Sequence, residues 1–247
     1  MLVDAHCHLT LPQFDSDRDA VIRRAKAEDV HIITSTVDPR ESELARRLTQ
    51  EHDNVSWTLG LTASTLDEAQ YEATARLIRK HRRDIVGLGE VGLDYYWVKR
   101  EEDRTRLRET FARFIQLSTE LDLPLVVHSR DAEEDCISML EEYRKPALLH
   151  CFSGTVEQAK DAIGFGCMIS IPANITYAKK RQKLAMEIPL GSIVLETDAP
   201  YLPPTPKTRN EPANVSVACE EMAKLKKIPR EEVASKTSEN AKAFFRL

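Results

Sequence analysis

The regular alternation of short, strand-like apolar runs with longer amphipathic stretches is the feature that most constrains the fold of this chain. Eight apolar runs have the length and composition of strands, and stretches with helical periodicity separate them. Strands that alternate with helices form parallel sheets, and eight such units close into a (β/α)8 barrel. The predicted strands are Leu2–His6, Val30–Ser35, Val55–Leu61, Ile85–Glu90, Pro124–His128, Ala147–His150, Cys167–Ile171 and Ile193–Glu196.

The predicted helices have apolar residues on one face. Seven of them lie between strands, and two follow the last strand after a Pro-rich loop, Pro200–Pro212. We expect Thr155 to cap the helix that follows it, and Asp15 or Ser16 to cap the first helix. The predicted helices are Asp17–Glu28, Glu41–His52, Leu66–Arg83, Glu101–Leu121, Asp131–Tyr143, Val156–Ile163, Lys179–Glu187, Glu211–Lys226 and Arg230–Phe245.

An open, doubly wound parallel sheet is the alternative fold. A Gly-rich phosphate loop after the first strand would favour that fold, and none is present there. The segment Gly87–Gly92 does match the pattern GxGxxG, but Asp94-Tyr95-Tyr96 follows it where a helix would have to begin. We interpret this match as chance. The sequence therefore predicts an α/β protein, a single-domain (β/α)8 TIM barrel over residues 1–247, with its active site at the carboxyl ends of the strands.

Composition and charge exclude some classes of protein. The chain has no run of 18 apolar residues, so no membrane-spanning helix is expected. A formal charge of −5 argues against a protein that coats nucleic acid through its overall field, although a local basic rim or bound metals can still hold a phosphate. Five scattered cysteines without a CxxC spacing, and no secretory signal pattern, predict reduced thiols in a cytoplasmic protein.

Histidines and carboxylates stand at the carboxyl ends of the predicted strands. In His6-Cys7-His8, side-chain alternation puts the two imidazoles on one face of the first strand and the thiol on the other. The carboxyl ends of barrel strands meet on one face, so side chains placed there are expected to converge. The residues in such positions are His6, His8, Glu90, His128, His150, Glu196 and Asp198.

This set of side chains is typical of a metal site. Imidazole nitrogens and carboxylate oxygens suit zinc, manganese, iron or magnesium. A lone histidine after a buried strand is more often a core residue, but its repetition on several strands favours a metal ligand. We choose Asp198 as the rim carboxylate that acts as ligand and base, and Glu196 as a residue that supports a ligand. Alternation predicts that Cys7 and Cys151 pack away from the metal face.

Six segments together resemble the TatD family of metal-dependent deoxyribonucleases, within the amidohydrolase-like (β/α)8 barrels. The likeness runs from the first strand to the last helix. The segments are Asp4-Ala5-His6-Cys7-His8-Leu9, Gly89-Glu90-Val91-Gly92-Leu93-Asp94-Tyr95-Tyr96, Pro124-Leu125-Val126-Val127-His128-Ser129-Arg130-Asp131-Ala132, Leu149-His150-Cys151-Phe152-Ser153-Gly154, Glu196-Thr197-Asp198-Ala199-Pro200-Tyr201-Leu202 and Asn210-Glu211-Pro212.

The resemblance implies two adjacent divalent metal ions per subunit, which we expect to be zinc, manganese or magnesium. Glu90 would bridge the two ions, and it shares the catalytic role with Asp198. The ligands of one ion would be His6, His8, Glu90 and Asp198, and those of the other would be Glu90, His128 and His150.

The leading hypothesis is metal-assisted hydrolysis of DNA phosphodiesters. Two metals would activate water and stabilise the attacking and leaving oxygens, with Asp198 as general base. Arg130 is expected to bind the scissile phosphate, and Lys207 and Arg209 to bind flanking phosphates. Tyr95, with the two aromatic residues after it, is expected to stack a terminal base. A cleft suits frayed ends and single strands, which favours exonuclease action by a protein that we expect to be monomeric.

One segment departs from the family pattern. The family usually carries Gly-x-His-Pro-His after the third strand, whereas this chain reads Gly60-Leu61-Thr62-Ala63-Ser64. Thr62 or Ser64 can donate a hydrogen bond to a phosphate oxygen, but neither supplies a cation or an acid. The departure raises the alternative of a metal-dependent deacylase or amidohydrolase acting on an ester or amide. A third hypothesis, a non-catalytic metal-binding scaffold, is disfavoured by the intact ligand set.

Overall fold

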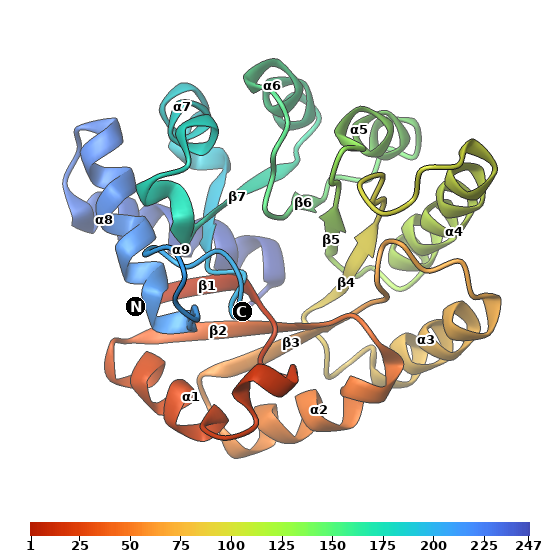
Figure 1. Cartoon of the computed structure of the whole chain (residues 1–247), viewed down its shortest axis with the longest axis horizontal. Coiled ribbons are helices and arrows are strands. Elements are labelled where there is room, and N and C mark those ends of the chain that lie inside the picture. Colours follow the sequence, from red (N-terminus) through yellow and green to blue (C-terminus); the bar gives the residue numbers. More distant parts are fainter.

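The eight predicted strands form one parallel sheet that curls into a barrel. The computed structural model describes residues 1–247, and its strands pair in chain order from β1 to β8 with helices on the outside (Figure 1). The strands are β1 Leu2–Cys7, β2 Val30–Thr36, β3 Val55–Leu59, β4 Gly87–Gly92, β5 Leu125–His128, β6 Leu148–Leu149, β7 Met168–Pro172 and β8 Ile193–Glu196. The helices are α1 Arg18–Ala27, α2 Ser42–Glu51, α3 Glu68–His81, α4 Glu101–Glu120, α5 Glu133–Glu142, α6 Val156–Gly164, α7 Lys179–Glu187, α8 Val215–Lys226 and α9 Arg230–Phe245.

The first and last strands meet near the carboxyl ends of the barrel strands. The backbone N–H of Asp198 donates to the carbonyl of His6 at 2.9 Å. The buried carboxylate of Asp4 accepts from both the backbone N–H and the hydroxyl of Thr197, each at 2.7 Å. These bonds join β1 to the segment after β8, so the predicted barrel is confirmed and the open-sheet alternative is wrong.

Most predicted boundaries agree with the structure within about two residues, and the differences have local causes. The helix predicted from Glu211 begins at Val215, because Pro212–Asn214 forms a 3-10 turn first. The backbone N–H of Asn214 donates to the carbonyl of Glu211 three residues earlier at 3.0 Å, which is the 3-10 pattern.

The predicted caps are right in one case and wrong in the other. Thr155 caps α6: its hydroxyl accepts from the backbone N–H of Gln158, and the Gln158 side chain accepts in return from the N–H of Thr155. Neither Asp15 nor Ser16 caps α1, whose first turn follows Asp17 without a side-chain bond.

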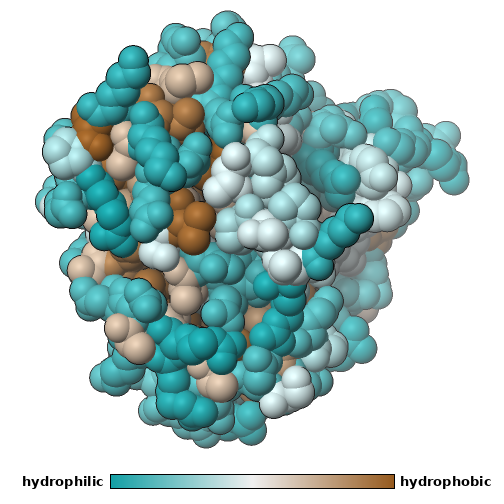
Figure 2. Space-filling view, turned by 60° about the vertical axis from the view of Figure 1, so that its left-hand side comes forward, coloured by the Kyte–Doolittle hydropathy of each residue, from teal (hydrophilic) through white to brown (hydrophobic).

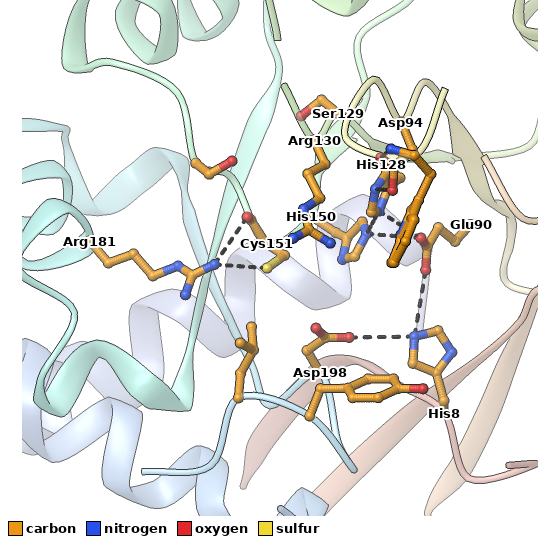
Figure 3. Close-up of a pocket in the computed structure, with 14 residues that line it drawn as sticks. His8, Glu90, Asp94, His128, Ser129, Arg130, His150, Cys151, Arg181 and Asp198 are labelled. Atoms are coloured by element: carbon orange, nitrogen blue, oxygen red, sulfur yellow. Dashed lines mark hydrogen bonds and ion pairs between the residues drawn. The ribbon is translucent and has the colours of Figure 1, made fainter. Parts of the chain in front are cut away.

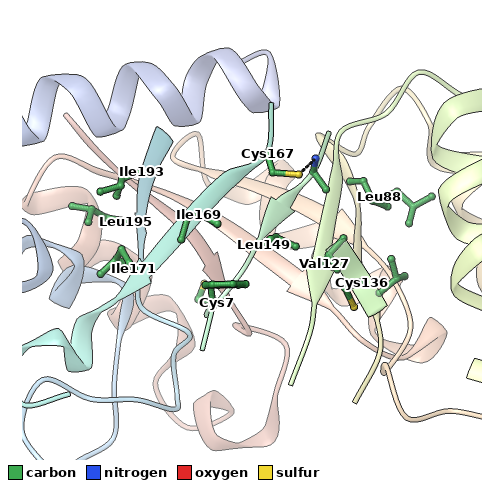
Figure 4. Packing of buried hydrophobic residues seen from close by; sticks show 14 of the residues in the cluster. Cys7, Leu88, Val127, Cys136, Leu149, Cys167, Ile169, Ile171, Ile193 and Leu195 are labelled. Carbon is green, nitrogen blue, oxygen red and sulfur yellow. Dashed lines mark hydrogen bonds between the residues drawn. The ribbon is translucent and has the colours of Figure 1, made fainter. Parts of the chain in front are cut away.

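Two hydrophobic clusters pack the barrel, one outside the sheet and one inside it. In the outer cluster, strand residues such as Val127, Leu149 and Leu195 face the helices (Figure 4). The inner cluster joins residues of strands on opposite sides of the barrel, and α9 closes that end of the barrel with Phe245. The inner strand residues are Val3, Ala5, Ile33, Val126, Leu148 and Val194.

Side-chain alternation then turns the next inward positions toward the rim. Two residues after the inner Val126, Leu148 and Val194 come His128, His150 and Glu196. The apolar inner layer thus supports a polar layer directly above it. Strand geometry alone places these three polar side chains inside the carboxyl end of the barrel.

An irregularity in β1 brings the first two histidines to the same place. Strict alternation from the inner Ala5 would turn His6 outward, but the pairing of β1 with β2 shifts register between Asp4 and Cys7. After this shift His6 and His8 face the site, while Cys7 packs in the outer cluster as expected. A similar register shift between β4 and β5 falls between Leu88 and Val91, the stretch that contains the inward Glu90.

The surface carries few large apolar groups. None of the helices combines the length and the apolar character needed to span a bilayer. The face around α8 is mainly hydrophilic, with apolar residues in small groups (Figure 2). The five cysteines are all free thiols.

Candidate metal centre

The carboxylate of Glu90 lies among four imidazoles at the carboxyl end of the barrel, of which Figure 3 labels those of His8, His128 and His150. Its Oε2 is 3.2 Å from Nε2 of His6 and 3.5 Å from Nε2 of His8. Its Oε1 is 2.8 Å from Nδ1 of His128 and 3.3 Å from Nε2 of His150. Each oxygen of this one carboxylate therefore faces a different pair of histidines, as a bridging ligand would.

Asp198 completes the cluster from the segment after β8. Its Oδ1 lies 3.4 Å from Nε2 of His8 and 3.9 Å from Nε2 of His6. Two triads, His6–Glu90–His150 and His6–His8–Asp198, have donor atoms that all lie within 4.8 Å of one another. The structure thus brings together all six side chains predicted to be ligands.

His6, in β1, and His8, just after it, differ strongly in proton affinity. Burial and the nearby charge of His150 lower the pKa of His6 to about 4. Burial opposes the charge on His8 too, but hydrogen bonding to Asp198 and the charges of Glu90 and Asp198 raise its pKa to about 9. Their Nε2 atoms are 3.2 Å apart. In the metal-free protein at neutral pH, His8 is therefore the charged imidazole of the two and His6 the neutral one.

His128 and Glu90 form a second pair in which each group shifts the pKa of the other. Burial works against a charged imidazole, yet hydrogen bonds with Asp94 and Glu90 raise the pKa of His128 to about 10. Burial also works against a charged Glu90, but the charge of His150 and the hydrogen bond from His128 hold its pKa well below its usual value. Glu90 is thus an anion at neutral pH.

The donor set fits divalent metal ions. No lysine or arginine lies within ion-pair distance of Glu90 or Asp198, although both carboxylates are largely buried. A buried charge without compensation is costly, and in the metal-free protein only protonated imidazoles compensate it. Nitrogen and carboxylate ligands at this spacing suit Zn²⁺, Mn²⁺ or Mg²⁺.

Asp94 is a site residue that the sequence analysis did not single out. Its Oδ2 lies 3.0 Å from Nε2 of His128, on the side of the ring opposite Glu90, and its Oδ1 accepts from the N–H of Trp97. A carboxylate in this position fixes the orientation and tautomer of a metal-binding imidazole. The only signal in the sequence is its place four residues after Glu90.

Glu196 lies behind His150, in the supporting position expected for it. Its Oε1 accepts from the backbone N–H of Cys151 at 2.8 Å, and its Oε2 is 3.8 Å from Nδ1 of His150. Complete burial raises the pKa of Glu196 to about 7. Neither Oε2 nor Nδ1 has a hydrogen-bond partner within 3.5 Å, so a small movement of either group would join them.

A cavity of about 590 Å³ opens above the cluster. Arg130 lines it, with its guanidinium stacked 3.6 Å from the centroid of the Tyr96 ring and no carboxylate in ion-pair distance. Cys151 lines it too, which corrects the expectation that this thiol packs away from the site. The backbone of Cys151 has φ 49°, so strand alternation no longer applies there.

The other expected substrate contacts lie outside the cavity. Tyr95 is buried and donates its hydroxyl to Asp135 at 2.5 Å, because the loop after β4 turns this ring under the surface. Arg209 is held by two hydrogen bonds to Asp17, and Lys207 is exposed on the same loop. None of these three residues lines the cavity, and their contact with a substrate stays a prediction.

The segment of residues 60–64 after β3, which departs from the family pattern, does not contribute Thr62 or Ser64 to the cavity either. The hydroxyl of Thr62 donates to the carbonyl of Val37 at 3.0 Å, and neither Thr62 nor Ser64 lines the cavity. On this side the cavity has no donor that replaces the missing histidines.

Comparison with known proteins decides the relationship. The sequence profile of the family described as "TatD related DNase" matches residues 3–246. The chain belongs to the TatD family. Among TatD relatives, the Bacillus subtilis "Uncharacterized metal-dependent hydrolase YabD" is 36% identical, with full coverage of both chains. The human "Deoxyribonuclease TATDN3" is 35% identical over 99% of this chain and 94% of its own.

Solved structures agree with this assignment. The TatD homologue YjjV from Escherichia coli K12 superimposes with a TM-score of 0.91 at 25% identity, covering 100% of this chain and 98% of its own. The resemblance found in the sequence motifs and the barrel predicted from alternation are both confirmed.

Proposed function

We propose that this TatD-family protein is a metal-dependent hydrolase that cleaves phosphodiester bonds in DNA, acting as an exonuclease on single strands or frayed ends. The observation that carries the proposal is the position of Glu90, whose two oxygens face separate histidine pairs beneath an open cavity. The relatives named as metal-dependent hydrolases and as a deoxyribonuclease support it.

The proposed cofactor is a pair of divalent ions, Zn²⁺, Mn²⁺ or Mg²⁺. When bound, such ions polarise phosphoryl oxygens and lower the pKa of water. The residues that would hold them are His6, His8, Glu90, His128, His150 and Asp198.

Asp198 is the proposed general base. Burial opposes its charge, but the hydrogen bond with His8 keeps its pKa below the usual value, so the carboxylate is ionised at neutral pH. Its Oδ1 faces the histidines, whereas its Oδ2 makes no hydrogen bond within the protein and borders the cavity. This free oxygen can accept the proton of the attacking water.

Arg130 is the proposed contact to the scissile phosphate. Its guanidinium lies in the cavity wall two residues after His128, and stacking on Tyr96 fixes its plane. A planar guanidinium with free N–H groups matches two phosphate oxygens at once.

Three further parts of the proposal concern the whole chain. Residues 1–247 would make up one hydrolase domain that works as a monomer. The five free cysteines support a reducing compartment, the cytoplasm. DNA would be the macromolecular partner.

A deacylase or amidohydrolase is the second candidate function. The observation that favours it is the absence of any cationic or acidic side chain from residues 60–64 after β3, where Thr62 bonds to Val37 instead. Hydrolysis of a phosphodiester chromogen, a phosphomonoester and an N-acyl amino acid would be compared at equal metal loading. The proposed function predicts a preference for the phosphodiester.

The variant Asp198→Asn tests the role of the base. The proposal predicts a fall in kcat of about 100-fold or more, the usual size of general base catalysis, with the fold retained. Asp131→Asn is the matched control, because Asp131 is an exposed carboxylate on the same face of the barrel with φ 56°, which asparagine tolerates. Full activity of a metal-loaded Asp198→Asn protein would contradict the assignment.

A further inference from the structure

A second arginine lies in the cavity wall without a counter-charge. The guanidinium of Arg181 donates to Oδ1 of the buried Asn174 at 2.8 Å and to Sγ of Cys151 at 2.9 Å. No carboxylate lies within ion-pair distance of it, and its Nε–H has no acceptor. Arg181 is therefore a fixed cation whose charge the protein leaves uncompensated.

Arg181 is separate from the metal cluster. Figure 3 shows it on the side of the cavity away from Glu90 and His8, with its guanidinium directed toward Cys151. An anion bound by Arg181 is therefore a different group from the one that the cluster and Arg130 would hold.

The cavity adjoins a surface groove at this arginine. The groove has a volume of about 310 Å³ and shares Ser153 and Arg181 with the cavity. Lys179 and Lys180, at the start of α7, line it further out, and both are exposed. No aspartate or glutamate lines the groove. A continuous strip of positive charge therefore leads from the cavity wall to the surface.

We propose that this groove binds the backbone of a single DNA strand beyond the bond that is cut, with Arg181, Lys179 and Lys180 on successive phosphates. This inference rests on the proposed function and gives it a direction: the strand leaves the cavity between α6 and α7, not past Lys207 and Arg209. A row of cations without intervening acids matches a regular polyanion, and phosphate contacts of this kind position a strand without reading its sequence.

The test measures binding separately from cleavage. Fluorescence anisotropy would follow a phosphorothioate-linked thymidine octamer, which keeps the backbone charge and resists hydrolysis, and the matching dinucleotide. The variant is Lys179→Gln/Lys180→Gln. Its control, Lys224→Gln/Lys236→Gln, removes the same charge from exposed lysines on α8 and α9, whose side chains are 71% and 48% exposed.

We expect the Lys179→Gln/Lys180→Gln protein to bind the octamer about tenfold more weakly, with a salt slope reduced by about 1.4, because each lost contact to a single strand removes about 0.7. Its affinity for the dinucleotide and the behaviour of the control should equal those of the wild type. In a second pair, Arg181→Met should weaken binding of both oligonucleotides, and Arg181→Lys should restore part of it.

Two results would overturn the inference: equal octamer binding by the variant and the wild type, or a wild type that binds no single strand. Failure of the proposed function looks different. In that case the metal-loaded wild type cleaves no phosphodiester, whatever it binds. If the wild type cleaves DNA and the Lys179→Gln/Lys180→Gln protein binds the octamer as tightly as the wild type, binding in the groove is disproved and the proposed hydrolase activity stands.

Discussion

At the scale of single residues, the centre depends on how His128 is held between two carboxylates. Nδ1 faces Glu90 at 2.8 Å and Nε2 faces Asp94 at 3.0 Å. If His128 holds a metal ion, as we propose, Asp94 would accept the remaining ring N–H and orient the imidazole without itself being a ligand.

Asp94→Asn should weaken metal binding by about 10- to 100-fold, the usual effect of removing such a partner from a ligand. Competition with a chromogenic chelator measures the affinity, and circular dichroism checks the fold. Asp131→Asn again serves as the control. An unchanged affinity in the Asp94 variant would show that the carboxylate does not orient His128.

Metal binding should also depend on pH. The pKa values of His8 and His128, about 9 and about 10, mean that both imidazoles are protonated at pH 7 in the metal-free protein. A metal must displace these protons, so its affinity should rise between pH 6 and pH 9, by about tenfold per pH unit for each proton released. Calorimetric titration in buffers of different ionisation enthalpy counts the protons. Affinity that is independent of pH in this range would contradict these pKa shifts.

The same two shifts fix a trend in stability. Both pKa values are raised above the unfolded value of about 6.5, so the folded metal-free protein binds these protons more tightly than the unfolded chain. The contribution of these two protonated histidines to the free energy of unfolding is complete below pH 6.5 and is lost as the pH rises through 9 to 10.

The structure brings the predicted ligands together but leaves most of the predicted substrate contacts outside the cavity, and the reason is geometric. The predicted ligands all lie within two residues of the carboxyl end of a strand, and for His128 and His150 a period of two residues fixes the direction of the side chain. Tyr95, Lys207 and Arg209 lie on irregular loops, where no period applies. Asp94 was missed for the same reason, and Arg181 was missed because its place in the cavity wall depends on how α7 packs, which helical periodicity does not show.

At the scale of elements, the irregular strands β1 and β4 are as important for directing side chains into the site as the regular strands are. Regular alternation predicts the inward positions of β5, β6 and β8, but the register shifts in β1 and β4 leave no obvious trace in hydrophobicity. Glycine is the visible sign in β4, because Gly92 has φ 140°, a conformation that a side chain would strain.

Gly92→Ala should destabilise the protein by at least about 2 kcal/mol, through backbone strain and overpacking. A Cβ at this position would lie 2.1 Å from the carbonyl oxygen of His128. Gly164→Ala, in α6, is the matched control because a Cβ there meets no atom within 4 Å. Urea denaturation compares the two variants. Equal stability of both would mean that β4 and β5 can separate without cost.

At the scale of the whole molecule, the barrel explains why residues spread over nearly 200 positions form one site. Eight strand ends meet on one rim, and bonds between Asp4 and Thr197 tie the first strand to the segment after the last. The fold class could be predicted from alternation alone, because the number and order of elements leave few topologies. The cavity shape could not, since it depends on loops.

Substrate choice also belongs to this scale, because the shape of the open cavity and the charge of its walls determine which molecules can bind. Digestion of end-labelled single-stranded DNA tests the central claim most directly. The protein would be stripped of metal with a chelator and then given Mn²⁺, Mg²⁺ or Zn²⁺, beside His128→Ala. We predict a ladder that starts from one end, appears only with metal, and falls at least about 100-fold in the variant. Intact DNA with a metal-loaded wild type, or equal cutting by the variant, would contradict the account.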